Sequence, residues 1–114
     1  MDTMDTFPKL PPLGSVRCLP FRDMIVHIRF VIELPDGRAA YYAAEGEPRG
    51  DDWVLWGLVR DFDGDVRLEE FSLSRLRGAA LSRGAPLIRD DAFEGRPMAR
   101  AMEAEGARAW DGDA

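Results

Sequence analysis

Apolar and polar positions alternate through the first half of the chain. In MIVHIRFVIEL, the apolar side chains at positions 26, 28, 30, 32 and 34 share one face, and this period of two predicts a strand. The residues Pro35-Asp36-Gly37 predict a turn, because proline fixes φ and glycine accepts positive φ. We expect residues 38–45 to return as a second strand and residues 46–52 to form a polar loop.

Residues 53–62 are apolar on both faces, which predicts a central strand that is covered on two sides. Gly57 within this strand indicates a bulge or a close neighbour.

The next segment, DFDGDVRLEE, has three aspartates around a glycine and is a candidate calcium-binding loop. Counted from Asp61, its glycine falls at position 4 and Val66 at position 6, whereas an EF-hand loop needs glycine at 6. Asp63-Gly64 between two strand patterns instead predicts a hairpin, and we predict no metal site.

The spacing of apolar residues changes after Phe71 from every second residue to every third or fourth. Leu73, Leu76 and Ala80 follow Ser72 at helical spacing, which predicts a short helix that Ser72 caps and that ends near Gly78 or Gly84. Residues 85–93 predict a brief strand or extended segment. A second helix follows from Arg96 to Gly106, with Met98 and Met102 as its packing stripe. The predicted fold is α+β: an antiparallel four-stranded meander, a possible short fifth strand, and two helices packed on one face.

A chain of 114 residues has room for one core, so we expect a single domain from 7 to 110. The polar ends 1–6 and 111–114 predict flexible tails. The proline-rich residues 7–15 predict an extended arm over the core. No apolar run reaches about 18 residues and the start does not resemble a signal peptide, which favours a cytoplasmic protein without a membrane partner. The single Cys18 fits a reducing compartment. We expect a monomer or weak homodimer.

The net charge of −6 argues against general attraction to nucleic acid or anionic membranes. The charge is uneven, however. Residues 72–89 contain four arginines and no acidic residue, so the rest of the chain carries −10. This basic segment is the one part of the chain with the charge needed to contact phosphates.

The sequence does not spell out a reaction, and we predict a protein that is not an enzyme and has no cofactor. The lone histidine, His27, is the natural general base, but its strand position favours a structural role. Neighbouring carboxylates such as Glu69 and Glu70 point to opposite faces of a strand and cannot work as a pair. Glu45 and Asp90 meeting at one end of the sheet is the remaining catalytic or metal-binding alternative.

Two binding functions of different class remain. In the first, the protein is an inhibitor that binds a basic surface on a host protein or nuclease complex. It would use acidic loops or an aromatic face, namely Asp51, Asp52, Asp61, Asp63, Asp65, Trp53 and Trp56. In the second, it is a nucleic-acid-binding accessory factor of a plasmid or integrative element that contacts phosphates through Arg75, Arg77, Arg83 and Arg89.

Five segments in order, IVHIRF, YYAAE, WGLV, FSLSRL and GAPLIRDDAFEGRP, resemble a small bacterial family known only as a domain of unknown function, number twenty-nine fifty-eight. The likeness covers residues 11–97. The chain departs from the pattern at Trp56, where the family has Phe, at Arg75, where it has Glu, and in 85–89, which lacks one acidic residue. The resemblance implies a protein of plasmids, integrative elements or phages, found near antirestriction genes. It therefore favours an anti-defence inhibitor of the anti-CRISPR or antirestriction type.

Overall fold

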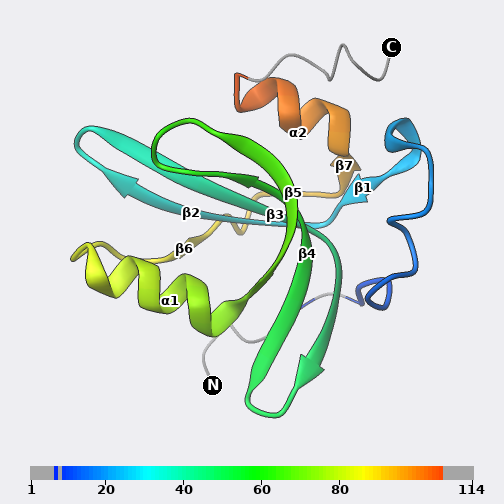
Figure 1. Ribbon diagram of the computed structural model, residues 1–114, viewed down its shortest axis with the longest axis horizontal. Coiled ribbons are helices and arrows are strands. Elements are labelled where there is room, and N and C mark those ends of the chain that lie inside the picture. The colour runs from blue at the N-terminus through cyan, green and yellow to red at the C-terminus, as the bar shows by residue number, and fades with distance from the viewer. Residues whose placement is uncertain (1–6, 8, 107–114) are drawn as a thin grey trace.

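The computed structural model describes residues 7 and 9–106, in which an antiparallel sheet of five strands is combined with two α-helices (Figure 1). The sheet has the order β5-β4-β3-β2-β6, and β1 and β7 form a separate ribbon. The elements are η2 (Phe21–Asp23), β1 (Ile25–Val26), β2 (Ile28–Leu34), β3 (Gly37–Arg49), β4 (Asp52–Arg60), β5 (Val66–Ser72), α1 (Leu73–Ser82), β6 (Ile88–Arg89), β7 (Arg96–Pro97) and α2 (Met98–Ala104). The predicted α+β class is confirmed. The predicted tails, 1–6 and 111–114, lie outside the described residues.

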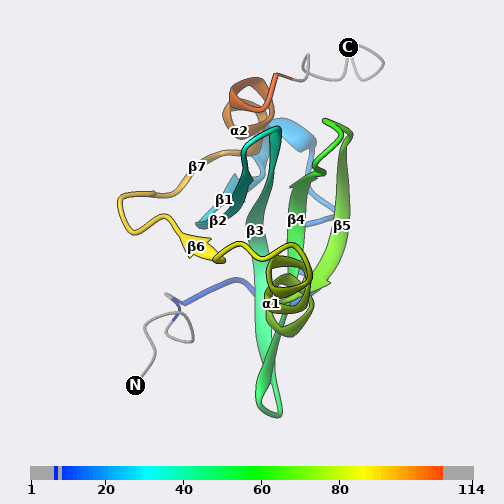
Figure 2. The ribbon, with the colours of Figure 1, turned by 90° about the vertical axis from the view of Figure 1, so that its left-hand side faces the viewer.

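The two helices pack on opposite faces of the sheet, so the prediction of two helices on one face is wrong. Leu73 and Leu76 of α1 join a cluster that includes Phe30. Met98 and Met102 of α2 join a second cluster on the other side. Because the central strands are apolar on both faces, each face needs its own cover. Figure 2 shows the helices well apart along the sheet.

The strand predicted for residues 24–34 is interrupted at His27. Ile28 pairs with Ala43 and begins β2, whereas Val26 pairs with Arg96 in the ribbon of β1 and β7. Val26 consequently packs in the cluster of α2, and Ile28 packs in the cluster of α1. The alternation in the sequence predicts both side chains on one face. It does not reveal that β1 leaves the sheet.

The hairpin of β3 and β4 is longer than predicted, because residues 46–49 continue β3 instead of forming a loop. Gly46 N–H donates to the carbonyl of Pro11 at 3.0 Å, on the side of β3 that β2 no longer covers. The backbone nitrogen of Pro48, two residues further on, faces the same side. A proline is tolerated there because no strand needs its missing N–H.

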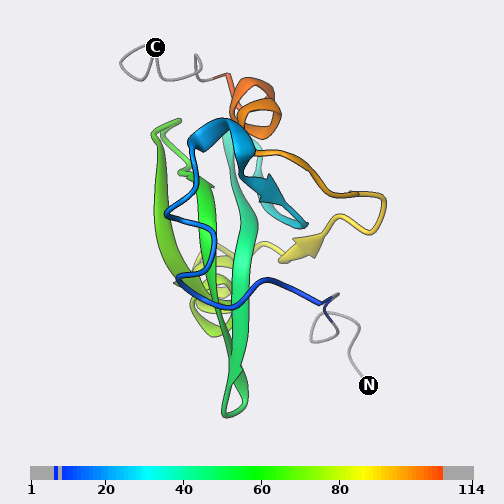
Figure 3. The same ribbon diagram turned by 90° about the vertical axis from the view of Figure 1, so that its right-hand side faces the viewer.

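The predicted Ser72 cap is confirmed, whereas α2 begins two residues later than predicted because Arg96 and Pro97 pair with β1. Ser72 accepts a hydrogen bond from Arg75 N–H at 3.2 Å and caps α1. Phe7 and Leu10 of the arm pack on the cluster of α1, and Figure 3 shows the N-terminal segment running along the sheet toward β1. Within the described residues, no helix has the length and hydropathy required to cross a membrane.

Candidate functional site

Arg67 in β5 forms ion pairs with the acidic turn between β4 and β5, residues 61–65. Its guanidinium donates to the carboxylates of Asp61 and Glu69, and Nη1 lies 3.2 Å from Asp65 Oδ2. The hydrogen bond to Asp61 is the first reason why the pKa of Arg67 is raised. Gly64 has φ of 91°, as the predicted hairpin requires. The described residues contain no group of three or more His, Cys, Asp or Glu side chains that could hold a metal ion.

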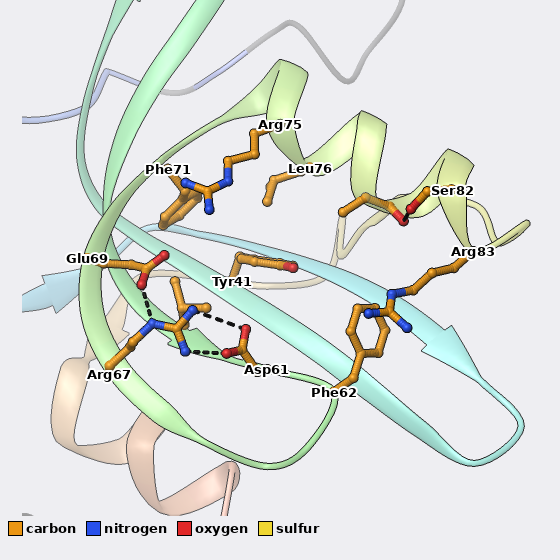
Figure 4. Close-up of a pocket in the computed structure, with 12 residues that line it drawn as sticks. Tyr41, Asp61, Phe62, Arg67, Glu69, Phe71, Arg75, Leu76, Ser82 and Arg83 are labelled. Carbon is orange, nitrogen blue, oxygen red and sulfur yellow. Dashed lines mark hydrogen bonds and ion pairs between the residues drawn. The ribbon is translucent and has the colours of Figure 1, made fainter.

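A pocket of about 230 Å³ opens between α1 and the end of the sheet that carries this turn (Figure 4). Tyr41 and Phe71, whose ring centroids are 5.6 Å apart, lie on the sheet side of it. Arg75 and Arg83 of the basic segment line the helix side, and Asp61 lines the wall beneath. The acidic turn and the basic segment belong to the two alternative functions predicted from the sequence. In the structure, residues of both line one pocket.

The Tyr41 hydroxyl points into this pocket, toward the end where Ser82 and Arg83 lie (Figure 4). Tyr41 is only 8% exposed, yet its hydroxyl forms no hydrogen bond with the described residues. Burial raises the pKa of Tyr41, and Asp61 adds to this effect. The positive charges of Arg67, Arg75 and Arg83 act in the opposite direction. Three arginines and one carboxylate therefore act on this hydroxyl.

The four arginines of the basic segment do not form one row. The guanidinium carbon of Arg83 lies 4.0 Å from the centre of the Phe62 ring, at the rim of the pocket. Arg77 is exposed on α1 outside the pocket. Arg89 lies in β6, with its guanidinium 5.3 Å from the centre of the Phe7 ring. Leu81, 82% exposed, adds an apolar side chain to the outer surface of α1.

Asp51 and Asp52 have different surroundings. Asp51 is exposed at the tip of the β3–β4 hairpin. Asp52 accepts hydrogen bonds from Ser74 N–H at 3.0 Å and from Ser74 Oγ at 2.6 Å, and so ties the start of β4 to α1. Burial opposes the charge of Asp52, but the hydrogen bonds from Ser74 and Trp53 outweigh it and lower the pKa of the carboxyl.

Trp53 and Trp56 pack within the domain and do not form an exposed aromatic face. The Trp53 ring lies 4.5 Å from that of Phe7 in an edge contact. Trp56 is 8% exposed and the Arg17 guanidinium carbon lies 4.9 Å from its ring centre. The exposed part of the first predicted binding set therefore consists of Asp51, Asp63 and Asp65.

The predicted acidic residues lie at opposite ends of β4. Asp51 and Asp52 are at its start and Asp61 follows its end, so about 30 Å separates the two groups at the rise of an extended strand. The turn of 61–65 has a different neighbour, the β2–β3 turn, since a Cβ on Gly37 would lie 3.1 Å from the Phe62 carbonyl oxygen. The two neighbouring turns carry the exposed side chains of Asp36, Asp63 and Asp65, which we call the acidic turn surface.

Glu45 has a structural role that the sequence did not reveal. The β3–β4 register shifts between Ala43 and Glu45, and this bulge places Glu45 opposite Trp56, on the face of α2. The fully buried carboxylate accepts hydrogen bonds from Gly14 N–H at 2.7 Å, Val16 N–H at 2.7 Å, and the backbone and guanidinium of Arg17. Burial would raise the pKa of Glu45, but these bonds outweigh it and lower the pKa.

Glu45 and Asp90 bind different arginines. Asp90 Oδ2 lies 3.2 Å from Arg29 Nη1, whereas Glu45 binds Arg17. Glu45 and Asp90 therefore belong to separate ion pairs and do not form one site. His27 is partly buried, and burial lowers the pKa of its imidazole.

No family model, curated protein or solved structure matches the chain. The family resemblance described above therefore stays a prediction. The site assignments below rest on the geometry of the chain itself.

Proposed function

We propose that the protein is a non-catalytic binding protein that inhibits a host protein or nuclease complex by occupying a basic surface on it. The acidic turn surface of Asp36, Asp63 and Asp65 is the contact region. In this proposal the protein is an anti-defence factor of a mobile element or phage, a context that the resemblance supplies.

The juxtaposition of two turns carries this proposal. The β2–β3 and β4–β5 turns touch where Gly37 packs against Phe62, and both present carboxylates to solvent. Asp65 is 66% exposed, and the turn that carries it is braced by Arg67. A braced turn loses little conformational freedom on binding, so its charges can attract a basic partner and fix its orientation.

The test compares charge reversals at the two ends of the sheet. The triple variant Asp36→Lys, Asp63→Lys, Asp65→Lys and the control Asp51→Lys are immobilised beside the wild type and exposed to host lysate. Mass spectrometry should identify one basic partner that wild type and control retain at equal levels and the triple variant loses. Equal retention of that partner by all three proteins would reject the acidic turn surface as the contact region.

The exposed arginines of α1 support the second candidate function, contact with nucleic acid. Arg75 and Arg77 of α1 and Arg83 at its C-terminal cap are all exposed, and the helix itself has no acidic residue. Titration with single-stranded and duplex DNA separates the two functions. We expect no binding tighter than about micromolar at physiological salt, where unspecific contacts have this strength. Tighter binding that disappears when these arginines are replaced by glutamine would favour the second function.

A further inference from the structure

The pocket between α1 and the sheet is lined by a tyrosine hydroxyl that has no protein partner among the described residues. The Tyr41 hydroxyl points into the pocket and forms no hydrogen bond with the described residues, although the residue is 92% buried. The hydroxyl itself is reached by solvent from the pocket, because Glu105 Oε1 is the one buried side-chain oxygen or nitrogen without a hydrogen bond among the described residues. A bound molecule can therefore accept a hydrogen bond from this hydroxyl in place of solvent.

The charges around the pocket select an anion. The carboxylates of Asp61 and Glu69 are both engaged by Arg67 (Figure 4). A cationic ligand would have to displace Arg67 from these carboxylates. The guanidinium groups of Arg75 and Arg83 have no carboxylate partner among the described residues, and both lie within reach of the same pocket. Arginine is well suited to bind carboxylate or phosphate oxygens in such a position.

The walls select an organic anion over an inorganic one. Phe62, Phe71 and Leu76 line the pocket with apolar surface. The cavity volume of about 230 Å³ lies below the usual range for drug-sized ligands. We propose that this pocket binds a small organic anion, whose carboxylate or phosphate group accepts hydrogen bonds from Tyr41, Arg75 and Arg83 and whose apolar body lies against Phe62 and Phe71. The site lies beside the acidic turn surface but includes none of its three aspartates, and it does not depend on the proposed function.

Phenyl phosphate is a suitable probe, because it combines the anionic group with a small aromatic body. Backbone amide signals of the ¹⁵N-labelled protein are followed by NMR during titration with phenyl phosphate, inorganic phosphate and benzylamine. Phenyl phosphate should cause saturable shifts centred on Tyr41, Phe71 and Arg83, and should bind at least fivefold more tightly than inorganic phosphate. Equal affinity for the two phosphates would overturn the assignment of an apolar subsite. Saturable binding of benzylamine in the pocket, or no saturable shift with phenyl phosphate, would overturn the proposed anion site.

Variants assign the polar contacts. Tyr41→Phe keeps the ring and removes the hydroxyl, and Arg83→Gln removes the charge. Each should weaken phenyl phosphate binding about tenfold, which is the usual effect of one charge-assisted hydrogen bond. Arg77→Gln, on the same helix but outside the pocket, is the control and should bind as the wild type does. Unchanged affinity in both Tyr41→Phe and Arg83→Gln, with native spectra, would overturn the proposal.

Discussion

Tyr41 and Tyr42 are neighbours in β3, but among the described residues only the Tyr42 hydroxyl has protein partners. Tyr42 donates to the buried carboxylate of Glu105 and accepts from Arg29 Nε at 3.1 Å. The hydroxyl of Tyr41, on the opposite face, points into the pocket beneath α1. Alternation along one strand thus gives one tyrosine a structural role and leaves the other available to a ligand.

Removing the two hydroxyls should have unequal effects on stability. Tyr42→Phe leaves Glu105 with one donor fewer in a buried position, so we expect a loss of about 1–3 kcal/mol in the free energy of unfolding. Tyr41→Phe removes a hydroxyl without a protein partner and should change stability by less than about 0.5 kcal/mol. Urea denaturation measures both values. A larger loss in Tyr41→Phe than in Tyr42→Phe would show that the Tyr41 hydroxyl has a structural partner.

Gly57 is required at the bulge of β3 and β4. A Cβ at this position would lie 1.8 Å from the Tyr42 carbonyl oxygen, so Gly57→Ala must displace the backbone of a central strand. We expect a loss of at least about 3 kcal/mol or a failure to fold. The control is Gly78→Ala in α1, where a Cβ meets nothing within 4 Å. It should stabilise the protein by about 0.5–1 kcal/mol, and thermal unfolding distinguishes the two outcomes.

Glu45 should make the free energy of unfolding depend on pH in the acidic range. The hydrogen bonds lower the pKa of Glu45 below the ordinary 4.5. The charged carboxylate therefore contributes fully to the free energy of unfolding above pH 4.5, and this contribution is lost as the pH falls through the lower pKa of the folded state. Glu45→Gln should cost on the order of 2 kcal/mol at pH 7 and reduce the slope of stability against pH below 4.5. Glu47→Gln, on the same strand and more exposed, is the control. An unchanged slope in Glu45→Gln would contradict this role.

Asp52 should stabilise the start of α1. Asp52→Ala removes the acceptor for both Ser74 N–H and Ser74 Oγ, and we expect a loss of about 1 kcal/mol, as for other helix caps. Asp51→Ala, next to it and exposed at the hairpin tip, should be neutral. Chemical denaturation compares the two variants. Equal stability of both would indicate that Ser72 alone caps the helix.

The sequence predicted features whose causes are local. Ser72 as a cap, Asp63-Gly64 as a hairpin turn, and Met98 with Met102 as a packing stripe each depend on nearby residues. The opposite placement of the helices also has a sequence signal, since β4 is apolar on both faces. A strand that is apolar on both faces needs a cover on each face, which two helices on one face cannot supply.

The sites could not be derived in the same way, because they depend on contacts between distant segments. The bulge that directs Glu45 toward Arg17 follows from the fit between Gly57 and the backbone of β3. The pocket depends on α1 folding back so that Arg83 reaches Phe62. Asp36 joins Asp63 only because two turns pack at one end of the sheet. A residue pattern within one segment cannot specify any of these pairings.

Inhibition of a nuclease tests the proposed function most directly. The complex recovered by wild-type protein is assayed for DNA cleavage with increasing amounts of wild type, Asp51→Lys, or the triple variant at Asp36, Asp63 and Asp65. We predict that wild type and Asp51→Lys stop cleavage at equimolar amounts and that the triple variant does not. Cleavage that continues at the same rate in an excess of wild-type protein would contradict the proposed function.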